Sequence, residues 1–479
     1  MSLSSALSSA ISGLTAASRA SGVVSDNLAN VMTPGYARRS LELASYGTAG
    51  SGVRVVGVQR HADPGIVSER RAADAEFGNA QTLSRFHDRF QALVGDPTDQ
   101  TSIGSRIAGL ESALISAASQ PESTLRLNGV VQAANALVDN ITAAADGVSR
   151  MRNEADTAIG VQIERLNDAL SNVRKLNLKI TATQSSGSDI ASLLDQRQGL
   201  VDQINEIVPV NQVDRDYGQI ALYTDGGAIL LDGQAARIGF TPTGIITPDM
   251  TVGNGALSGL DINGVALGAS AIAGGSLAAE FEIRDNLSVS AQADLDTVAR
   301  DLIERFETPS LDPSASVGDP GLFTDAGATF DPLLETGLAG RLSLNKVVDP
   351  AEGGESWRLR AGLGASGPGL PGDASQIRAF ADVLEEARTP ASTTLGTGLK
   401  TAAGLGSALM SRAAQNASFS GQTLTFATAS KTEMTRIELE QGVDTDAELQ
   451  TLMIVEQAYS ANARMISAID DMMETLLRL

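Results

Sequence analysis

The chain is long and acidic: its 479 residues include 57 Asp and Glu against 35 Lys and Arg, a formal net charge of −22. This charge opposes broad binding to nucleic-acid phosphates or anionic membranes, because both require basic patches. The sequence has no cysteine and only two histidines, His61 and His87, which excludes thiolate chemistry and leaves little material for a histidine-based active site. We therefore expect a structural protein rather than an enzyme, with no cofactor and no metal.

The N-terminal segment predicts a helix that needs a partner. Its first eighteen residues, MSLSSALSSAISGLTAAS, carry no charge and lack the basic start of a secretory signal peptide. Apolar or small residues recur at a 4-3-4-3 spacing from Leu3 to Leu28, which is a heptad-like seam. Terminal segments usually fray unless they dock, so this seam indicates contact with another segment or another chain.

Short β-structure follows and then a long helical region. Thr33-Pro34-Gly35-Tyr36 has the residue order of a type II turn, and the alternating apolar residues of 41–58 predict a hairpin. The pattern from about Pro64 to Val208 is helical. Pro209 marks a change to β-structure with hairpin signals at Asp225-Gly226 and Asp232-Gly233, and helices return at 276–306, 374–388 and 402–440.

The C-terminus carries a second heptad-like seam. A 3-4-3-4 spacing runs from Leu452 to Leu476, and Thr445 and Glu448 stand in capping-box spacing at the expected helix start. Asn462 falls on this seam, where it either fixes the register as a buried polar residue or reaches solvent across the wide face.

These patterns predict a mainly α fold with β-rich insertions in an elongated, multi-domain chain whose termini lie side by side. The N- and C-terminal helices would pair as a coiled-coil-like domain, followed by a helical-bundle middle domain and a β-rich outer domain. We expect the boundaries to be 1–45 with 441–479 for the terminal assembly domain, 46–208 with 276–307 and 375–440 for the helical rod-like domain, 209–275 for the β-rich domain, and 308–374 for a Gly/Pro-rich β or irregular outer insertion at the surface.

Both ends of the sequence resemble one family. The run NLANVMTPGYAR at 27–38 closely resembles the N-terminal signature of bacterial flagellar rod, hook and hook-associated proteins, and GVDTDAELQTLMIVEQAYSANARMISAIDDMMETLLRL resembles their C-terminal signature. The interior segments SLLDQRQGLVDQINEIVPV, DYGQIALYTDGGAILLDGQAARIGF and GGSLAAEFEIRDNL are similar to the hook-associated proteins of the first hook–filament junction type. The signature residues are Asn27, Leu28, Ala29, Asn30, Thr33, Pro34, Gly35, Tyr36 and Arg38.

The resemblance implies a structural subunit of the flagellum. Such proteins leave the cytoplasm through the flagellar type III apparatus and assemble outside the cell at the hook–filament junction, where their terminal helices pack against neighbouring subunits. The expected partners are the hook protein, the second hook–filament junction protein, further copies in a ring, and a cytoplasmic export chaperone on the C-terminal helix, with no nucleic acid and no membrane insertion. The residues expected at the assembly interface are Leu3, Leu7, Leu14, Val24, Leu28, Leu452, Val455, Tyr459, Asn462, Ile466, Ile469, Met473 and Leu476. We also expect the uncharged face of Ser5, Ser8, Ser12 and Thr15 to line a central lumen.

Other functions stay open on the sequence alone. A close alternative is another axial protein, such as the hook protein or the second junction protein. A secreted coiled-coil effector, or a hydrolase with its site within 209–375, is a more distant one. Because His61 and His87 both lie outside that span, such a hydrolase would have to work through carboxylates.

Overall fold

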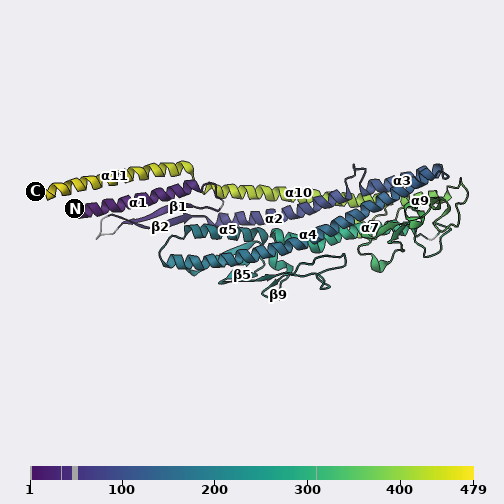
Figure 1. Cartoon of the computed structure of the whole chain (residues 1–479), viewed down its shortest axis with the longest axis horizontal. Helices are drawn as coiled ribbons and strands as arrows, with labels where there is room; N and C mark the ends of the chain where they lie inside the picture. Colours follow the sequence, from purple (N-terminus) through teal and green to yellow (C-terminus); the bar gives the residue numbers. More distant parts are fainter. Residues whose placement is uncertain (1–2, 34, 46–51, 309, 479) are drawn as a thin grey trace.

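The molecule is elongated, with both chain ends at one end of its long axis (Figure 1). The computed structural model describes residues 3–33, 35–45, 52–308 and 310–478. It is 63% helical with small sheets. The prediction of a mainly α, elongated fold with β-rich insertions is confirmed.

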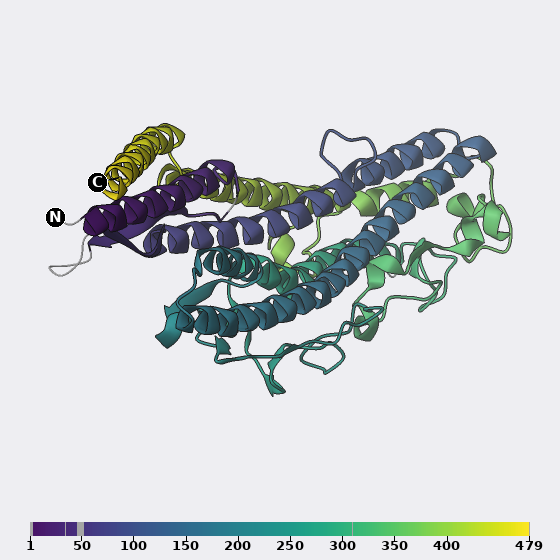
Figure 2. The same ribbon diagram turned by 60° about the vertical axis from the view of Figure 1, so that its left-hand side comes forward.

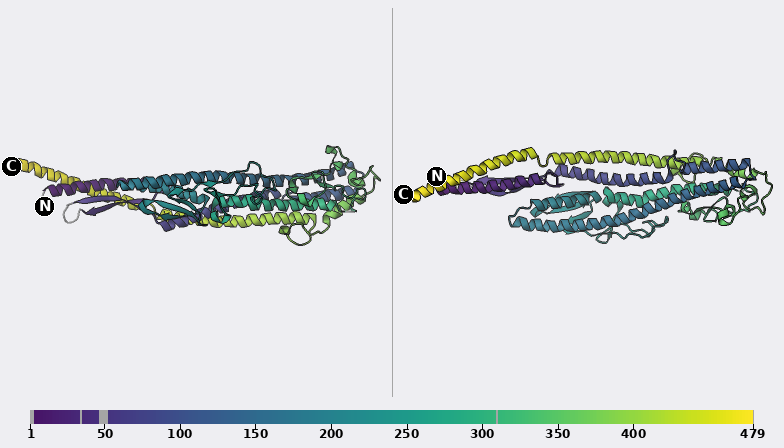
Figure 3. Two further views of the ribbon diagram at one scale, coloured as in Figure 1. Left: turned by 90° about the horizontal axis from the view of Figure 1, so that it is seen from below. Right: turned by 45° about the horizontal axis from the view of Figure 1, so that its top comes forward.

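The two terminal helices form one pair. Helix α1 (Leu3–Ala29) runs antiparallel beside α11 (Thr445–Leu477), as Figures 1 and 3 show from three sides. The N-cap of α11 is Asp444 and not Thr445 as expected: the Asp444 carboxylate accepts from the backbone N–H groups of Asp446 and Ala447. A carboxylate suits this position because it satisfies the first unpaired N–H groups and the positive end of the helix dipole.

A two-stranded hairpin lies against α1. Strands β1 (Arg38–Ser45) and β2 (Val53–His61) pair antiparallel, as predicted, with a bulge between Glu42 and Leu43. The boundary that we expected after residue 45 separates these two paired strands, so the hairpin has to be assigned to the terminal helices as one piece.

Within the described residues, eight helices build the central bundle, whose arrangement Figure 2 shows. They are α2 (Pro64–Val94), α3 (Ile103–Ser119), α4 (Thr124–Ser185), α5 (Ala191–Ile207), α6 (Gly275–Glu282), α7 (Ser288–Phe306), α9 (Ser375–Glu385) and α10 (Ala402–Glu440). Asp63 caps α2 with Pro64 in its first turn, and Thr401 caps α10 through the N–H of Gly404. The 62 residues of α4 correspond to about 93 Å at 1.5 Å per residue. This helix therefore runs along most of the bundle and contributes to both of its hydrophobic cores.

The β-rich part packs on the C-terminal half of α4. Strands β3 (Val210–Asp214), β4 (Ile220–Thr224), β5 (Ile229–Asp232) and β6 (Gln234–Ala235) form a four-stranded antiparallel sheet, and β7 (Ile238–Gly239), β8 (Asp261–Ile262) and β9 (Val265–Ala266) form a second sheet. Side chains of β4 and β5 share the smaller hydrophobic core with α4 and α5. The predicted change to β-structure at Pro209 is therefore confirmed.

The stretch 308–374 is not the surface feature that we expected. It contains strands β10 (Phe323–Asp325) and β11 (Leu342–Leu344), helix α8 (Arg358–Ala361) and short 3₁₀ turns. Among the described residues of this stretch, nine apolar side chains belong to the larger core: Leu322, Phe323, Leu338, Ala339, Leu342, Leu344, Val348, Leu359 and Leu363. Its irregular backbone hid this role, because no helical or strand period marks these residues in the sequence. The remaining 3₁₀ turns of the chain are η2 (Asp216–Gly218), η3 (Ala269–Ile272) and η9 (Thr393–Leu395).

A π-helical turn (Ile283–Leu287) between α6 and α7 carries a fully buried arginine. Arg284 pairs with buried Asp156 of α4 at 2.8 Å and with Asp285 at 2.8 Å, and it lies near the rings of Phe240 and Phe281. π-turns of this kind redirect one side chain out of the regular helical pattern. Here the turn belongs to the segment GGSLAAEFEIRDNL, and it ties α4 to the α6–α7 segment.

Candidate assembly surface and polar junction

The N-terminal signature forms a hydrogen-bonded turn around Asn27. This residue is fully buried, its amide donates to the Arg39 carbonyl at 2.8 Å, and its side-chain oxygen accepts from the Tyr36 hydroxyl at 2.8 Å and the Arg39 N–H at 3.0 Å. Gly35 has φ +77°, and the Tyr36 N–H donates to the Thr33 carbonyl at 3.1 Å. Both features are those of the predicted type II turn, although Pro34 itself lies outside the described residues. The signature therefore fixes the angle at which the chain leaves α1.

The other signature residues at the end of α1 differ in their hydrogen bonding and exposure. Asn30 accepts from the Thr33 hydroxyl at 3.2 Å and donates to the Asp26 carbonyl, which closes the end of α1. Leu28 is half-buried and Ala29 is exposed.

An ion pair connects the two family signatures. Arg38 Nε lies 2.7 Å from Glu448 Oε1, and Glu448 is buried although it belongs to the first turn of α11. The residue that the sequence suggested as half of a capping box is thus the partner of the N-terminal signature. Residues 410 positions apart in the chain are held together by this contact.

Most of the predicted interface residues are buried or half-buried in the single chain, and three of them are exposed. Val24 and Ile469 are buried. Half-buried positions at the seam are Leu3, Leu7, Leu14, Leu28, Leu452, Val455, Asn462 and Ile466. Tyr459, Met473 and Leu476 are exposed in the single chain.

Asn462 packs directly over a glycine of α1. A Cβ added at Gly13 would lie 2.8 Å from Asn462 Nδ2 and Oδ1, so the Asn462 side chain would have to shift to admit it. The Asn462 amide donates to the Ala458 carbonyl at 2.9 Å, within its own helix. The side chain is therefore half-buried at the helix–helix contact, and its fit over Gly13 specifies how the two helices are aligned.

Helix α11 keeps a second, exposed apolar face. Met453, Ile454, Met465 and Met472 are 49 to 67% exposed, and Ile11 on α1 is 50% exposed. Large apolar side chains exposed on a protein surface are typical of contacts with other molecules. Methionine in particular adapts to irregular partners.

The predicted lumen face is only partly open. Ser8 and Thr15 are exposed, but the Ser12 hydroxyl accepts a hydrogen bond from the Val53 N–H at 3.1 Å, which places Ser12 against the hairpin. The expectation that Ser12 faces a lumen is therefore wrong, because the end of β2 covers it. The sequence pattern could not show which side of α1 the hairpin occupies.

A polar junction joins the hairpin to the bundle. Arg39 and Arg60 stand opposite each other in the β1–β2 register, and both reach Asp195 of α5, with Arg39 Nη2 2.5 Å from Oδ2 and Arg60 Nε 2.7 Å from Oδ1. The three side chains are only 12 to 15% exposed. Arg60 also donates to Gln198, whose amide donates to Glu438 of α10 at 3.3 Å.

A second ionic cluster lies within the bundle beside this junction. Arg70 of α2 pairs with Asp74 at 2.5 Å, with Asp202 of α5 at 2.7 Å and with Glu438, while Arg71 pairs with Asp202 at 2.6 Å. Burial alone would lower the pKa of Arg70, but Asp202, Glu438 and Asp74 raise it above its ordinary value. The guanidinium therefore stays charged and holds α2, α5 and α10 together.

Sequence reasoning did not single out these junction residues. A signal was present within the segment SLLDQRQGLVDQINEIVPV, where Asp195, Gln198, Asp202 and Asn205 recur at i, i+3, i+7 and i+10 and so share one face of a helix. A polar stripe on a helix that also has an apolar face indicates polar partners rather than solvent alone. The partners themselves, two arginines in a distant hairpin, could not be read from this spacing.

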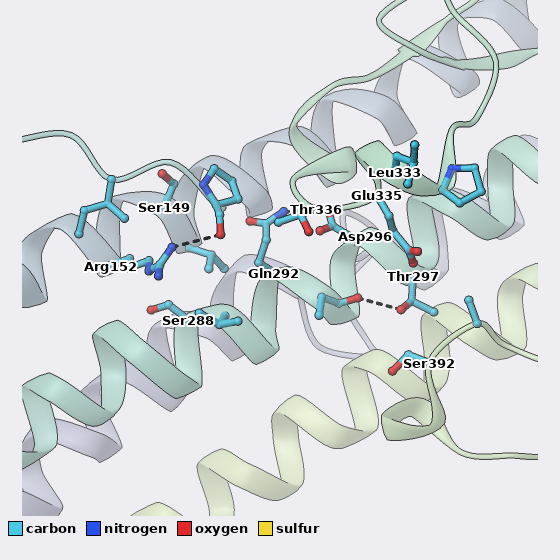
Figure 4. Close-up of a pocket in the computed structure, with 17 residues that line it drawn as sticks. Ser149, Arg152, Ser288, Gln292, Asp296, Thr297, Leu333, Glu335, Thr336 and Ser392 are labelled. Carbon is cyan, nitrogen blue, oxygen red and sulfur yellow. Dashed lines mark hydrogen bonds between the residues drawn. The ribbon is translucent and has the colours of Figure 1, made fainter. Parts of the chain in front are cut away.

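The cavity drawn in Figure 4 has a volume of about 350 Å³ and lies between α4, α7 and the 332–336 turn. Several of its polar side chains are already engaged by the protein: Asp296 accepts from Gln292 and from the N–H groups of Gly337 and Ala339, each at 2.8 or 2.9 Å. Arg152 donates to backbone carbonyls, among them that of Arg284 at 2.8 Å. Burial raises the pKa of Asp296. These contacts fasten the 337–340 turn to α7, which is a structural role.

The two histidines are far from each other in the fold. The Ser40 hydroxyl lies 2.7 Å from His61 Nε2 on the exposed side of the hairpin, whereas His87 packs on Phe86 in α2, where burial lowers its pKa. Within the described ranges, no three His, Cys, Asp or Glu side chains are placed to hold a metal ion. In the same part of the chain, none of the helices combines the length and the hydropathy needed to cross a membrane.

Both ends of the chain match families of flagellar proteins. Residues 7–36 match the flagella basal body rod protein family, and residues 440–479 match the C-terminal region of the flagellar basal body rod FlgEFG proteins. Together with the paired terminal helices, these matches define an axial protein of the bacterial flagellum. Residues 78–310 match the helical domain of the flagellar hook-associated protein FlgK.

Curated relatives agree with this assignment. Flagellar hook-associated protein 1 of Salmonella typhimurium is 28% identical over 244 residues, which is 49% of this chain and 44% of that protein, and the protein of the same name from Escherichia coli is 25% identical over the same coverage. The match thus spans less than half the length of these two relatives. Flagellar hook-associated protein 1 of Bacillus subtilis is 20% identical over 98% of this chain and 97% of its own length. A solved structure of the flagellar hook junction protein FlgK from Burkholderia pseudomallei aligns with a TM-score of 0.46 at 18% identity, covering 54% of this chain and 46% of that one.

Proposed function

We propose that this chain is a structural subunit of the hook–filament junction, an adaptor between the hook and the flagellin filament that filament assembly requires. The observation that carries the proposal is the terminal helix pair. One face of α11 packs on α1, while a second face leaves Met453, Ile454, Met465 and Met472 in solvent. Neighbouring subunits in a tube would supply the missing burial.

The same surface supports the proposed partners. Further copies of the chain would pack side by side in a ring, with the hook protein on one side of the ring and the second hook–filament junction protein on the other. Before export, an exposed apolar helix is an aggregation hazard, so a cytoplasmic chaperone on α11 fits its properties. Export through the flagellar type III apparatus and a final place outside the cell complete the proposal.

The interface residues and the domain division are part of this proposal. Tyr459, Met473 and Leu476 would contact neighbouring subunits, since they are exposed in the single chain. We keep the terminal, helical and β-rich domains as proposed units, with the hairpin assigned to the terminal one. The stretch 308–374 joins the helical unit, because its apolar side chains lie in the same core.

The test is an in-frame deletion strain examined by electron microscopy, with an immunoblot for flagellin in the medium. Hooks without filaments, together with flagellin monomer in the medium, are the expected result, and the wild-type gene should restore filaments. Loss of the hooks would assign the protein to the rod or hook instead. Normal filaments in a strain with no second copy of the gene would reject the proposal and favour a secreted effector.

A second test addresses the chaperone. Truncation of the chain after Gly442 should abolish recovery of a co-purifying cytoplasmic chaperone, and recovery of the same complex from the truncated chain would reject a site on α11. Circular dichroism of the truncated chain should show that the bundle helices remain.

A further inference from the structure

The terminal unit, defined as α1, the β1–β2 hairpin and α11, is joined to the bundle by polar contacts. Among the described residues, neither hydrophobic core includes a side chain of 3–61 or of 441–478. The chain crosses between the two parts at residues 62–63 and again at 441–444. The angle between the terminal unit and the bundle therefore depends on side-chain contacts rather than on a shared apolar core.

One carboxylate provides the ion pairs across this boundary. The Arg38–Glu448 pair lies within the terminal unit, and the Arg70 cluster lies within the bundle. The ion pairs that join the two parts, among the described residues, are those of Arg39 and Arg60 with Asp195. Gln198, a neutral side chain on the same face of α5, accepts a further hydrogen bond from the Arg60 guanidinium.

Asp195 also removes a conflict within the hairpin. Arg39 and Arg60 are cross-strand partners, and like charges directly opposite each other destabilise a strand pair. Each oxygen of Asp195 faces one of the two guanidinium groups, and all three side chains are largely shielded from solvent. Without this carboxylate, two half-buried cations would repel each other and would keep no anionic partner on α5.

We infer that Asp195 is a positioning residue that fixes the angle of the terminal unit on the bundle. With Asp195 ionised, the hairpin is held on α5 and the terminal helices point along the long axis, as Figures 1 and 3 show. With the charge removed, the terminal unit swings about its two chain connections, while α1–α11 pairing and the bundle stay intact because their own contacts do not involve Asp195.

The test uses distance measurements between spin labels on the full chain. The sequence has no cysteine, so two introduced cysteines label only the chosen sites. Lys179→Cys on α4 with Ser467→Cys on α11 reports the angle between the two parts, and Lys179→Cys with Ala92→Cys on α2 reports the bundle alone; all three positions are exposed. Asp195→Asn is the test variant and Asp195→Glu the conservative one. Glu154→Gln, which breaks the exposed 2.6 Å pair with Arg89 in the bundle, is the matched control.

We expect Asp195→Asn to lower the ratio of docked to undocked terminal units roughly ten- to a hundredfold, the usual range for losing hydrogen bonds to a charged group. The 179–467 distance distribution then broadens while the 92–179 distribution stays narrow. Asp195→Glu restores much of the narrow distribution, and Glu154→Gln changes neither. An unchanged 179–467 distribution in Asp195→Asn overturns the inference, and so does broadening of both pairs, which would mean loss of the fold.

A measurement in cells connects the role of Asp195 to the proposed function. The interpretation of this measurement rests on the proposed function. In the deletion strain, Asp195→Asn should restore fewer filaments than the wild-type gene, and Asp195→Glu should restore more than Asp195→Asn. Failure of the wild-type gene to restore filaments would count against the proposed function. The spin-label result stands apart from it.

Discussion

The close approach of Asn462 to Gly13 allows a sharp test of the helix pair. A methyl group at Gly13 would lie 2.8 Å from the Asn462 amide atoms, whereas a methyl group at Gly22, on the same helix, would meet no atom within 4 Å. Gly22 is therefore a matched control for the gain in helix propensity. That gain is about 1 kcal/mol when alanine replaces glycine inside a helix.

The expected difference follows from the geometry. Gly22→Ala should stabilise the α1–α11 pair by up to about 1 kcal/mol. Gly13→Ala has the same propensity gain, but Asn462 must rotate away and lose its fit over α1, which costs roughly 1–2 kcal/mol by analogy with overpacked contacts. Gly13→Ala should therefore leave the pair unchanged or slightly weaker, about 1 kcal/mol or more below Gly22→Ala.

Hydrogen exchange of α1 and α11, read by mass spectrometry on the full chain, measures this difference directly, because local opening of the terminal pair is expected below global unfolding. A change of 1 kcal/mol corresponds to about a fivefold change in protection. Asn462→Ala combined with Gly13→Ala should recover the propensity gain, since the clash is gone. Equal protection in Gly13→Ala and Gly22→Ala would refute the packing of Asn462 on Gly13.

Three further predictions address the signature turn, the ion pair of the terminal unit and a buried acid. Gly35→Ala should destabilise the turn by about 1–2 kcal/mol, because the φ of +77° at Gly35 disfavours a side chain. Loss of hydrogen-exchange protection in residues 35–45 checks this, with Gly398→Ala as a control in which the added methyl group meets no neighbour. Equal effects of the two substitutions would contradict the prediction. Glu448→Gln should weaken the contact between β1 and α11 by about 1–3 kcal/mol, since buried Glu448 loses its charge opposite Arg38. Hydrogen exchange in the first turn of α11 is the measurement, and Glu456→Gln at an exposed position is the control. Unchanged protection in Glu448→Gln would argue against the Arg38–Glu448 ion pair. Burial raises the pKa of Glu280 to about 7, so this group favours the folded state most below its unfolded pKa, and that contribution to stability is lost as the pH rises toward 7. Glu280→Gln should therefore stabilise the chain at pH 8, on the order of 2 kcal/mol, and change its stability little at pH 4. Urea unfolding is the measurement, and the same effect of the substitution at both pH values would exclude this reasoning.

The sequence predicted the parts of the fold that have a period or a turn signal. The α1 and α11 seams, the 41–58 hairpin and the change of structure at Pro209 all follow from spacing and turn residues, and the structure has each of them. The 308–374 stretch shows the opposite case. Its core side chains, such as Phe323 and Leu359, sit in irregular backbone, and their burial depends on helices distant in the sequence.

The residues of the candidate assembly surface also differ in how far the sequence could predict them. Val24 and Ile469 could be predicted as contact residues because the helical period places them on one face. The role of Glu448 was misjudged, because a local capping pattern was visible and its partner, Arg38, lies at the other end of the chain. Asp195 had a local signal as a polar residue on an apolar helix, but two arginines brought together by strand register had none.

The antiparallel arrangement of α2 and α10 has a mechanical consequence. The chain leaves the terminal unit through α2 and returns to it through α10, so tension between the terminal unit and the far end of the bundle is shared by two helices in parallel. Pulling in this direction loads both helices along their whole packed length, so many contacts would have to break at once. A force that peels α10 sideways from α2 would break them one after another, so the molecule should resist axial tension far better than lateral load.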